Sequence, residues 1–381
     1  MEFLLGILFL ILLVVGKTIV YCRERYRFEG PRFIGKMVIL IILLSIPAAG
    51  PVYNYWRKGQ VEELHIAFRL NQVDKVKEMI SSGVSVHHRG KGGDLAIHAA
   101  VSSGNMELLK LVLEKEVNLE EWSKSKYTPL CMTAQRGFIE MMKVLLDHGA
   151  QVDSRSSFNN TPLMIAIRKG RLDMVELLLS RGADVTARDN NTRDPFFHAV
   201  VHLRPKILQL LLDKKKHRLD QDSLGFNLLH DVNMYGTMFR KKEINALEQL
   251  EETVKILDKA GISWTEFDKK GRTPSHIAFE YQKGEILDTL IKAGANLEAK
   301  NHDGDTPLHV AIRKRHWTGV RRLYDLGADV RAKTHEGLMA FELAQKYTLN
   351  AETIELLRPE GHVEKEDETE ADKEGSALGG H

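Results

Sequence analysis

Apolar residues recur along most of this chain at the spacing of a helix, and the same arrangement returns at a fixed distance. Two such groups of three are Met141, Val144, Leu145 and Val175, Leu178, Leu179. Spacings of three and four residues place the side chains of each group on one face of a helix. We therefore expect each group to lie in the core between neighbouring repeated units.

A tetrad of residues marks the start of each unit. It reads Thr306-Pro307-Leu308-His309 late in the chain, and Thr273-Pro274-Ser275-His276 stands 33 residues earlier. The fourth position recurs at 33-residue steps, with one gap of 46, at His65, His98, Cys131, Met164, Phe197, His230, His276, His309 and Glu342. A fixed period of this length is typical of a stacked solenoid. We count nine units over residues 61–358.

Signals for helix ends fall at fixed places in these units. In pairs such as Thr161-Pro162, the threonine is expected to cap a helix and the proline to occupy its first turn. Gly149, Gly182 and Gly294 are expected to supply the left-handed residue that follows a second helix.

Together the tetrad, the period and the glycines resemble the ankyrin-repeat family. The resemblance implies an all-α repeat solenoid, in which each repeat has a β-turn or hairpin followed by an antiparallel helix pair. We expect about nine repeats over 57–360. The sixth is 13 residues longer than the others, and the extra residues near 237–249 most simply lengthen its second helix, to about 241–259. A partner contact and a neutral elaboration both remain open there.

Two apolar runs precede the repeats. Extended to about 20 residues each, 3–22 and 37–56 are long enough to cross the hydrocarbon of a bilayer as two membrane helices. A buried core helix, or one span with a signal-like or re-entrant second segment, are the alternatives. The loop 22–36 between them is basic, so the positive-inside rule keeps it in the cytoplasm. We therefore expect a membrane protein, multi-pass or anchored by one span, with its repeats on the non-cytoplasmic (periplasmic-type) side.

Charge is distributed unevenly along the chain. The overall net charge is +2, which argues against a nucleic-acid partner. Residues 1–60 carry a net +5 and residues 361–381 a net −5. The latter segment lacks apolar periodicity, and we expect an acidic disordered tail. The two cysteines, Cys22 and Cys131, are not expected to form a disulfide.

Catalytic and metal-binding motifs are absent from the sequence. The chain has no His-Glu-x-x-His motif, and two separate cysteines cannot form a cysteine-rich zinc site. We expect no enzyme activity, no cofactor, no metal and no small-molecule substrate. The ankyrin resemblance implies that the tetrad histidines are structural: each hydrogen-bonds to backbone and joins successive turns.

The resemblance also implies protein binding, through the turn tips and the inner, concave face of the first helices. The family's variable positions, carried onto this register, are Tyr127, Gln135, Arg136, Phe158, Asn160, Arg168, Lys169, Arg193, His202, Phe226, Met234, Tyr235, Arg272, Tyr281 and Arg313. Aromatic and arginine side chains are enriched in binding patches. We expect two kinds of partner. Residues 3–56 contact a lipid bilayer, and the chain acts as a scaffold that holds a protein partner at the membrane. The alternative is an immunity or inhibitor protein that neutralises a toxin or enzyme outside the cytoplasm.

Overall fold

The computed structural model describes residues 57–214, 227–235, 246–280 and 295–359, and all regular structure in these ranges is helical. A helix at 57–69 comes first. It is followed by α3 (Val73–Ser81), α4 (Ala96–Ser103), α5 (Met106–Leu113), α6 (Pro129–Arg136), α7 (Ile139–Asp147), α8 (Pro162–Lys169), α9 (Leu172–Ser180), α10 (Pro195–Val201), α11 (Pro205–Lys214), α12 (Leu228–Tyr235), α13 (Ala246–Lys259), α14 (Pro274–Glu280), α16 (Pro307–Arg313), α17 (Trp317–Asp325), α18 (Ala340–Lys346) and α19 (Ala351–Leu356).

The helices begin where the sequence predicts. Helices α6, α8, α14 and α16 start at the proline of a Thr-Pro pair. Thr161 caps α8, because its hydroxyl accepts the backbone N–H of Met164 at 3.3 Å. Asp194 plays the same part in α10, accepting the N–H of Phe197 at 2.9 Å. After the second helices, Gly149 and Gly182 adopt positive φ angles of 88° and 85°, as expected; Gly294 lies outside the described residues.

Each predicted unit contributes a first helix that contains the fourth residue of its tetrad. These first helices are 57–69, α4, α6, α8, α10, α12, α14, α16 and α18. The second helices are α3, α5, α7, α9, α11, α13, α17 and α19, and that of the seventh unit falls outside the described residues. The lengthened helix of the sixth unit is described from Ala246 to Lys259, 14 residues. Its predicted start at 241–245 lies outside the described ranges.

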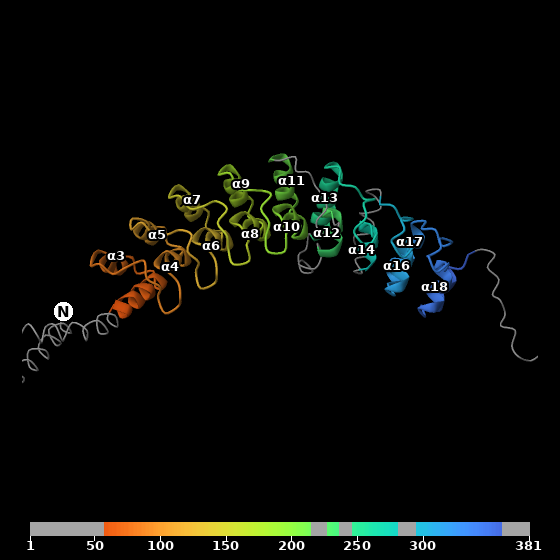
Figure 1. Ribbon diagram of the computed structural model, residues 1–381, viewed down its shortest axis with the longest axis horizontal. Coiled ribbons are helices and arrows are strands. Elements are labelled where there is room, and N and C mark those ends of the chain that lie inside the picture. The colour runs from red at the N-terminus through yellow and green to blue at the C-terminus, as the bar shows by residue number, and fades with distance from the viewer. Residues whose placement is uncertain (1–56, 215–226, 236–245, 281–294, 360–381) are drawn as a thin grey trace, which may run out of the picture. The chain divides into compact units, whose positions relative to one another are not determined.

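The chain divides into two compact units. Unit 1 holds the residues up to Thr133 together with Glu140–Gln151, and unit 2 holds Ala134–Ile139 and the residues from Val152 onward. Within unit 1, α3 and α4 both pack against α5. Within unit 2, the first helices α8, α10, α12, α14, α16 and α18 pack each against the next, and α11 lies against both α9 and α13 (Figure 1). Within each unit, the described helices therefore bury their apolar faces against neighbouring helices.

The predicted core stripe is correct in four of six positions. Met141, Leu145, Val175 and Leu178 are buried. Val144 and Leu179, however, are partly exposed. Met142 and Met174 are fully buried instead. The buried residues in the two helices are thus Met141, Met142 and Leu145, and the three residues that stand 33 positions later, Met174, Val175 and Leu178.

The predicted membrane spans and the acidic tail all lie outside the described residues. Within the described ranges, no helix combines the length and the apolar character that crossing a bilayer requires.

Candidate functional site

Short tip loops lie within the connections between each second helix and the first helix of the next repeat. Those described in full are 89–94, 122–127, 155–160, 188–193, 267–272, 300–305 and 333–338. They share one hydrogen-bond pattern, seen in 155–160: Ser156 N–H donates to the carbonyl of Asn160 at 3.1 Å, and Asn159 N–H donates to the carbonyl of Ser156 at 2.9 Å. The hydroxyl of Ser156 also accepts the N–H of Asn160. Each tip loop is thus closed on itself by its own backbone.

In unit 2, two successive tip loops are also bonded to each other. The guanidinium of Arg155 donates to the carbonyl of Asn159 at 2.9 Å and to that of Arg188, in the next loop, at 3.0 Å. The side-chain amide of Asn159 donates to the same Arg188 carbonyl. Between these bonds lies Phe158, whose carbonyl accepts the N–H of Asn190 at 3.3 Å and whose side chain is 63% exposed. A large aromatic ring is therefore displayed on a fixed backbone.

Cationic and aromatic candidates lie at the ends of the first helices of unit 2. Arg168 is half-buried and Lys169 exposed in the last turn of α8. Arg193 lies over the ring of Phe197, 4.7 Å from its centroid, in a cation–π contact. His202, which follows α10, is half-buried. These side chains are thus exposed or half-buried.

Near the end of α6, Gln135 is half-buried and Arg136 is exposed. Both belong to the short segment Ala134–Ile139 of unit 2. Tyr127 is half-buried and belongs to unit 1. Its backbone closes the tip loop 122–127, since its carbonyl accepts the N–H of Ser123 at 2.8 Å.

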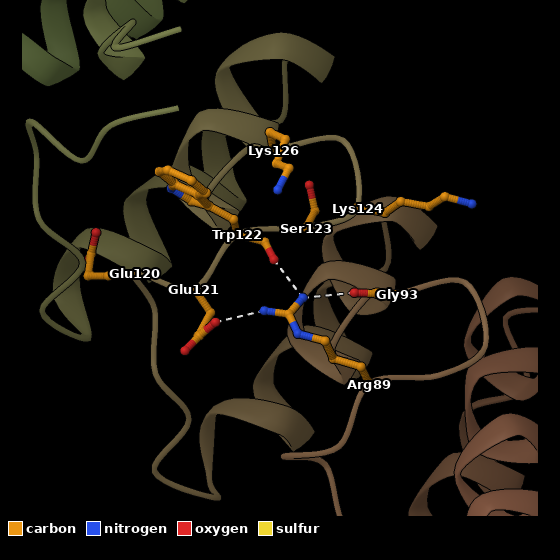
Figure 2. Close-up of a pocket in the computed structure, with 8 residues that line it drawn as sticks. All are labelled: Arg89, Gly93, Glu120, Glu121, Trp122, Ser123, Lys124 and Lys126. Carbon is orange, nitrogen blue, oxygen red and sulfur yellow. Dashed lines mark hydrogen bonds and ion pairs between the residues drawn. The ribbon is translucent and has the colours of Figure 1, made fainter. Parts of the chain in front are cut away.

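The tip loops of unit 1 form a pocket of about 560 Å³ that the sequence analysis missed (Figure 2). Arg89 spans its wall: the guanidinium donates to the carbonyl of Trp122 and the carboxylate of Glu121, each at 2.7 Å. The Trp122 ring is 42% exposed, and the ammonium of Lys126 lies 5.8 Å from its centroid. The sequence does contain a signal for the exposed Trp122. It stands 33 residues after Arg89 and 33 before Arg155, so one repeat has a tryptophan at the position where its neighbours have an arginine.

Three candidate residues have structural surroundings that the sequence analysis did not foresee. Asn160 is only 7% exposed, because it closes its tip loop from the inside. Arg272 forms an ion pair with Asp268 at 2.7 Å and another with Glu280. Arg313 donates to both carboxylate oxygens of Asp305, at 2.7 and 3.2 Å. In all three residues, polar groups make contacts within the chain, and partner binding at these positions stays a prediction.

The remaining candidates lie where side chains are not described. Phe226 and Tyr281 fall outside the described residues altogether. Met234 and Tyr235 belong to α12, but their side chains are outside the described set.

Three of the tetrad histidines, His98, His230 and His276, connect successive repeats, as the resemblance implied. His276 Nδ1 accepts the N–H of Thr273 at 3.1 Å, and Nε2–H donates to the carbonyl of Asp305, in the next tip loop, at 2.9 Å. His98 and His230 make the same two kinds of bond. Since Nδ1 accepts a hydrogen bond, the ring is neutral. Burial lowers the pKa of His276 to about 4, because a charged imidazolium would lose its water.

In the described part of the chain, no group of three or more His, Cys, Asp or Glu residues is arranged to hold a metal ion. What the geometry offers instead is a set of fixed loop tips that carry exposed aromatic and cationic side chains. Such groups suit recognition of another macromolecule.

Comparison with known families matches four segments of the chain, 64–156, 121–189, 151–223 and 244–334, to Ankyrin repeats (3 copies). No curated protein matches the chain. The matched segments cover about two thirds of the sequence. Ankyrin repeats are a non-catalytic interaction fold, and this chain belongs to the ankyrin-repeat family.

Proposed function

We propose that this chain binds a protein partner through the tip loops and first helices of its repeats. The observation that carries the proposal is Phe158, a 63% exposed ring on a loop fixed by hydrogen bonds to its neighbour. Burying such a ring in a partner contributes about 2 kcal/mol. Because the loop is already ordered, little conformational entropy is lost on binding.

Charge indicates the chemistry of the partner. Arg168 and Lys169 end the first helix of the repeat whose tip carries Phe158. Neither side chain is paired with a carboxylate among the described residues. A partner with an apolar side chain flanked by acidic residues would complement this surface.

The test compares proteins captured by the full-length chain and by two variants. Phe158→Ala should reduce the capture of specific partners by about tenfold, since 1.4 kcal/mol corresponds to a factor of ten. Trp317→Ala is the matched control, because Trp317 is also exposed, at 43%, but begins the second helix α17. Equal loss with both variants, or retention with both, would contradict the proposal.

A double variant separates the effect on partner binding from the effect on stability. Tyr127→Ala combined with Arg168→Ala should weaken binding of the captured partner while leaving the thermal unfolding temperature nearly unchanged, since both side chains are partly exposed. Calorimetry and a binding titration measure the two effects. An unfolded array would mean that these side chains are structural.

We further propose that residues 3–56 hold the chain at a membrane, with the repeats on the non-cytoplasmic side, where their concave face holds the partner. The two apolar runs and the basic loop 22–36 support this. A topology reporter that is active on only one side of the membrane, fused after residue 360, tests it. A cytoplasmic signal would contradict the predicted side and favour a cytoplasmic scaffold.

The second candidate function is that of an immunity or inhibitor protein. The fixed tip loops support it, because a rigid face can block an enzyme or toxin by occupying its active surface. Co-expression with a toxic protein encoded beside this gene is the test: rescue of growth, lost with Phe158→Ala, would favour inhibition over a scaffold role.

A further inference from the structure

A second pocket in unit 1, about 590 Å³ in volume, shares Arg89 with the first pocket but is otherwise lined by different residues. It is lined by Arg57, Lys58, Val61, His88, Arg89, Gly90 and Lys91. Two segments supply these residues: the helix at 57–69 and the loop that follows α3. Its volume is within the range of small-molecule sites, about 300–1,000 Å³.

Close packing fixes these two segments against each other. Gly90 lies so near the ring of His65 that a Cβ atom at this position would be 2.8 Å from the ring carbons. The backbone N–H of Lys91 donates to the carboxylate of Glu62, on the helix, at 2.8 Å. The pocket is therefore formed before any ligand arrives.

The pocket holds more positive charge than its surroundings neutralise. Arg57, Lys58 and Lys91 have no carboxylate partner among the residues that the structure describes. Arg89 differs, since its guanidinium is paired with a glutamate in the next tip loop. The nearby Glu62 carboxylate accepts the Lys91 backbone N–H and is 4.0 Å from a guanidinium nitrogen of Arg69. Three cationic side chains thus line one pocket without an ion-pair partner among the described residues.

One of these cations donates to a weak acceptor. A guanidinium nitrogen of Arg57 is 2.8 Å from Nε2 of His88, and Nδ1 of His88 is 2.8 Å from the hydroxyl of Ser85. Because a guanidinium only donates, Nε2 must be the unprotonated nitrogen and Nδ1–H donates to Ser85. Partial burial and then the charge of Arg57 lower the pKa of His88. An anion would be a stronger acceptor for Arg57 than this neutral ring.

We propose that this pocket binds a phosphate monoester through Arg57, Lys58 and Lys91. A phosphate monoester carries close to two negative charges and three acceptor oxygens at neutral pH, which matches three cationic side chains from two segments. A carboxylate offers one charge and two oxygens and would leave part of the set unpaired. The phosphate belongs either to a lipid headgroup at a membrane surface or to a soluble compound.

The first experiment titrates inorganic phosphate into the full-length protein, held in neutral phosphatidylcholine discs, by calorimetry at constant ionic strength. Phosphate should bind where chloride does not. Lys58→Gln and Lys91→Gln should each weaken binding by about tenfold, the effect of one hydrogen bond between charged groups. Both side chains are exposed, so folding should be retained. Lys77→Gln, an equal charge change on α3, is the control and should bind as the original chain does.

The second experiment follows His88 by NMR and separates the two sources of phosphate. A bound dianion should raise the pKa of His88, because it favours the imidazolium. A rise in discs containing phosphatidic acid, without added phosphate, identifies a lipid headgroup; a rise only with added inorganic phosphate identifies a soluble ligand. Identical behaviour in phosphate and chloride, with no response to phosphatidic acid, would overturn the proposal. So would phosphate binding that Lys58→Gln and Lys91→Gln leave unchanged.

Discussion

Lowering the pH from 7 to 5 should destabilise this protein, and His276 is the residue that shows why. Its ring is fully buried, and burial lowers its pKa to about 4 in the folded chain. In the unfolded chain the same ring titrates near 6.5. Between these two values the unfolded state binds a proton that the folded state does not. Stability is therefore present above pH 6.5 and is lost as the pH falls toward 4.

The size of the effect follows from the two pKa values. Each pH unit between them removes up to about 1.4 kcal/mol per histidine. From pH 7 to 5, His276 alone should cost about 2 kcal/mol of the free energy of unfolding. Burial also lowers the pKa of His98, His230 and His309. Their contributions have the same sign, so the whole chain should lose more than His276 alone accounts for.

Urea unfolding of the full-length chain at pH 7, 6 and 5, followed by circular dichroism, measures this loss. His276→Gln removes one titrating group while keeping a side-chain N–H that can reach the carbonyl of Asp305. The variant is expected to be less stable at pH 7 but to lose about 2 kcal/mol less than the original chain on going to pH 5. An unchanged pH dependence in His276→Gln would refute the reasoning. A direct NMR titration that gave His276 a pKa near 6.5 would refute it too.

Two further changes test the tip loops. Thr192 has a φ of 63°, a left-handed conformation that costs a β-branched residue roughly 1–2 kcal/mol. Thr192→Gly removes this strain but adds the entropy cost of ordering a glycine, so the free energy of unfolding should rise by about 1 kcal/mol. Asn159→Gly should give no such gain, because asparagine tolerates this conformation and its amide also donates to the next loop; equal effects at both positions would contradict the argument. Asp305→Asn should cost about 2 kcal/mol, since Arg313 loses a buried charged acceptor. Arg321→Gln, which removes an exposed ion pair, should cost less than about 1 kcal/mol. Urea unfolding midpoints that showed Arg321→Gln to be less stable than Asp305→Asn would contradict the importance given to the Asp305–Arg313 pair.

Sequence alone predicted the repeat register, the helix starts and the role of three tetrad histidines, His98, His230 and His276. These features depend on signals that are local or strictly periodic. A Thr-Pro pair caps its own helix, and a 33-residue step brings His276 to the tip loop of the next repeat at Asp305. No knowledge of distant contacts is needed for either inference, which is why both agree with the structure.

Surface positions were harder to predict, because their availability depends on neighbours that are not periodic. Asn160 occupies a variable position, yet its loop closes around it. Trp122 was not among the predicted residues, although its ring is exposed at the pocket of unit 1 (Figure 2). Arg313 is paired with Asp305, eight positions earlier, and such a contact between two side chains is not part of the hydrophobic periodicity that predicts the helices.

This relation yields a last prediction. Asp305 immediately precedes a tetrad and pairs with Arg313, eight residues later. In the repeat that carries Phe158, the corresponding residues are Asn160 and Arg168, and Asn160 is neutral. Arg168 has no carboxylate partner among the described residues, so its charge is available to a partner protein.

Asn160→Asp should give Arg168 the internal partner that Arg313 already has. Partner binding should then weaken by roughly tenfold, the loss of about 1.4 kcal/mol, without any change to Arg168 itself. The free energy of unfolding should not fall, because the new carboxylate gains an ion pair. A binding titration with the captured partner and a urea curve measure the two quantities. If affinity is retained while the protein stays folded, Arg168 does not contact the partner, and the binding surface must be sought at Phe158 and the tip loops alone.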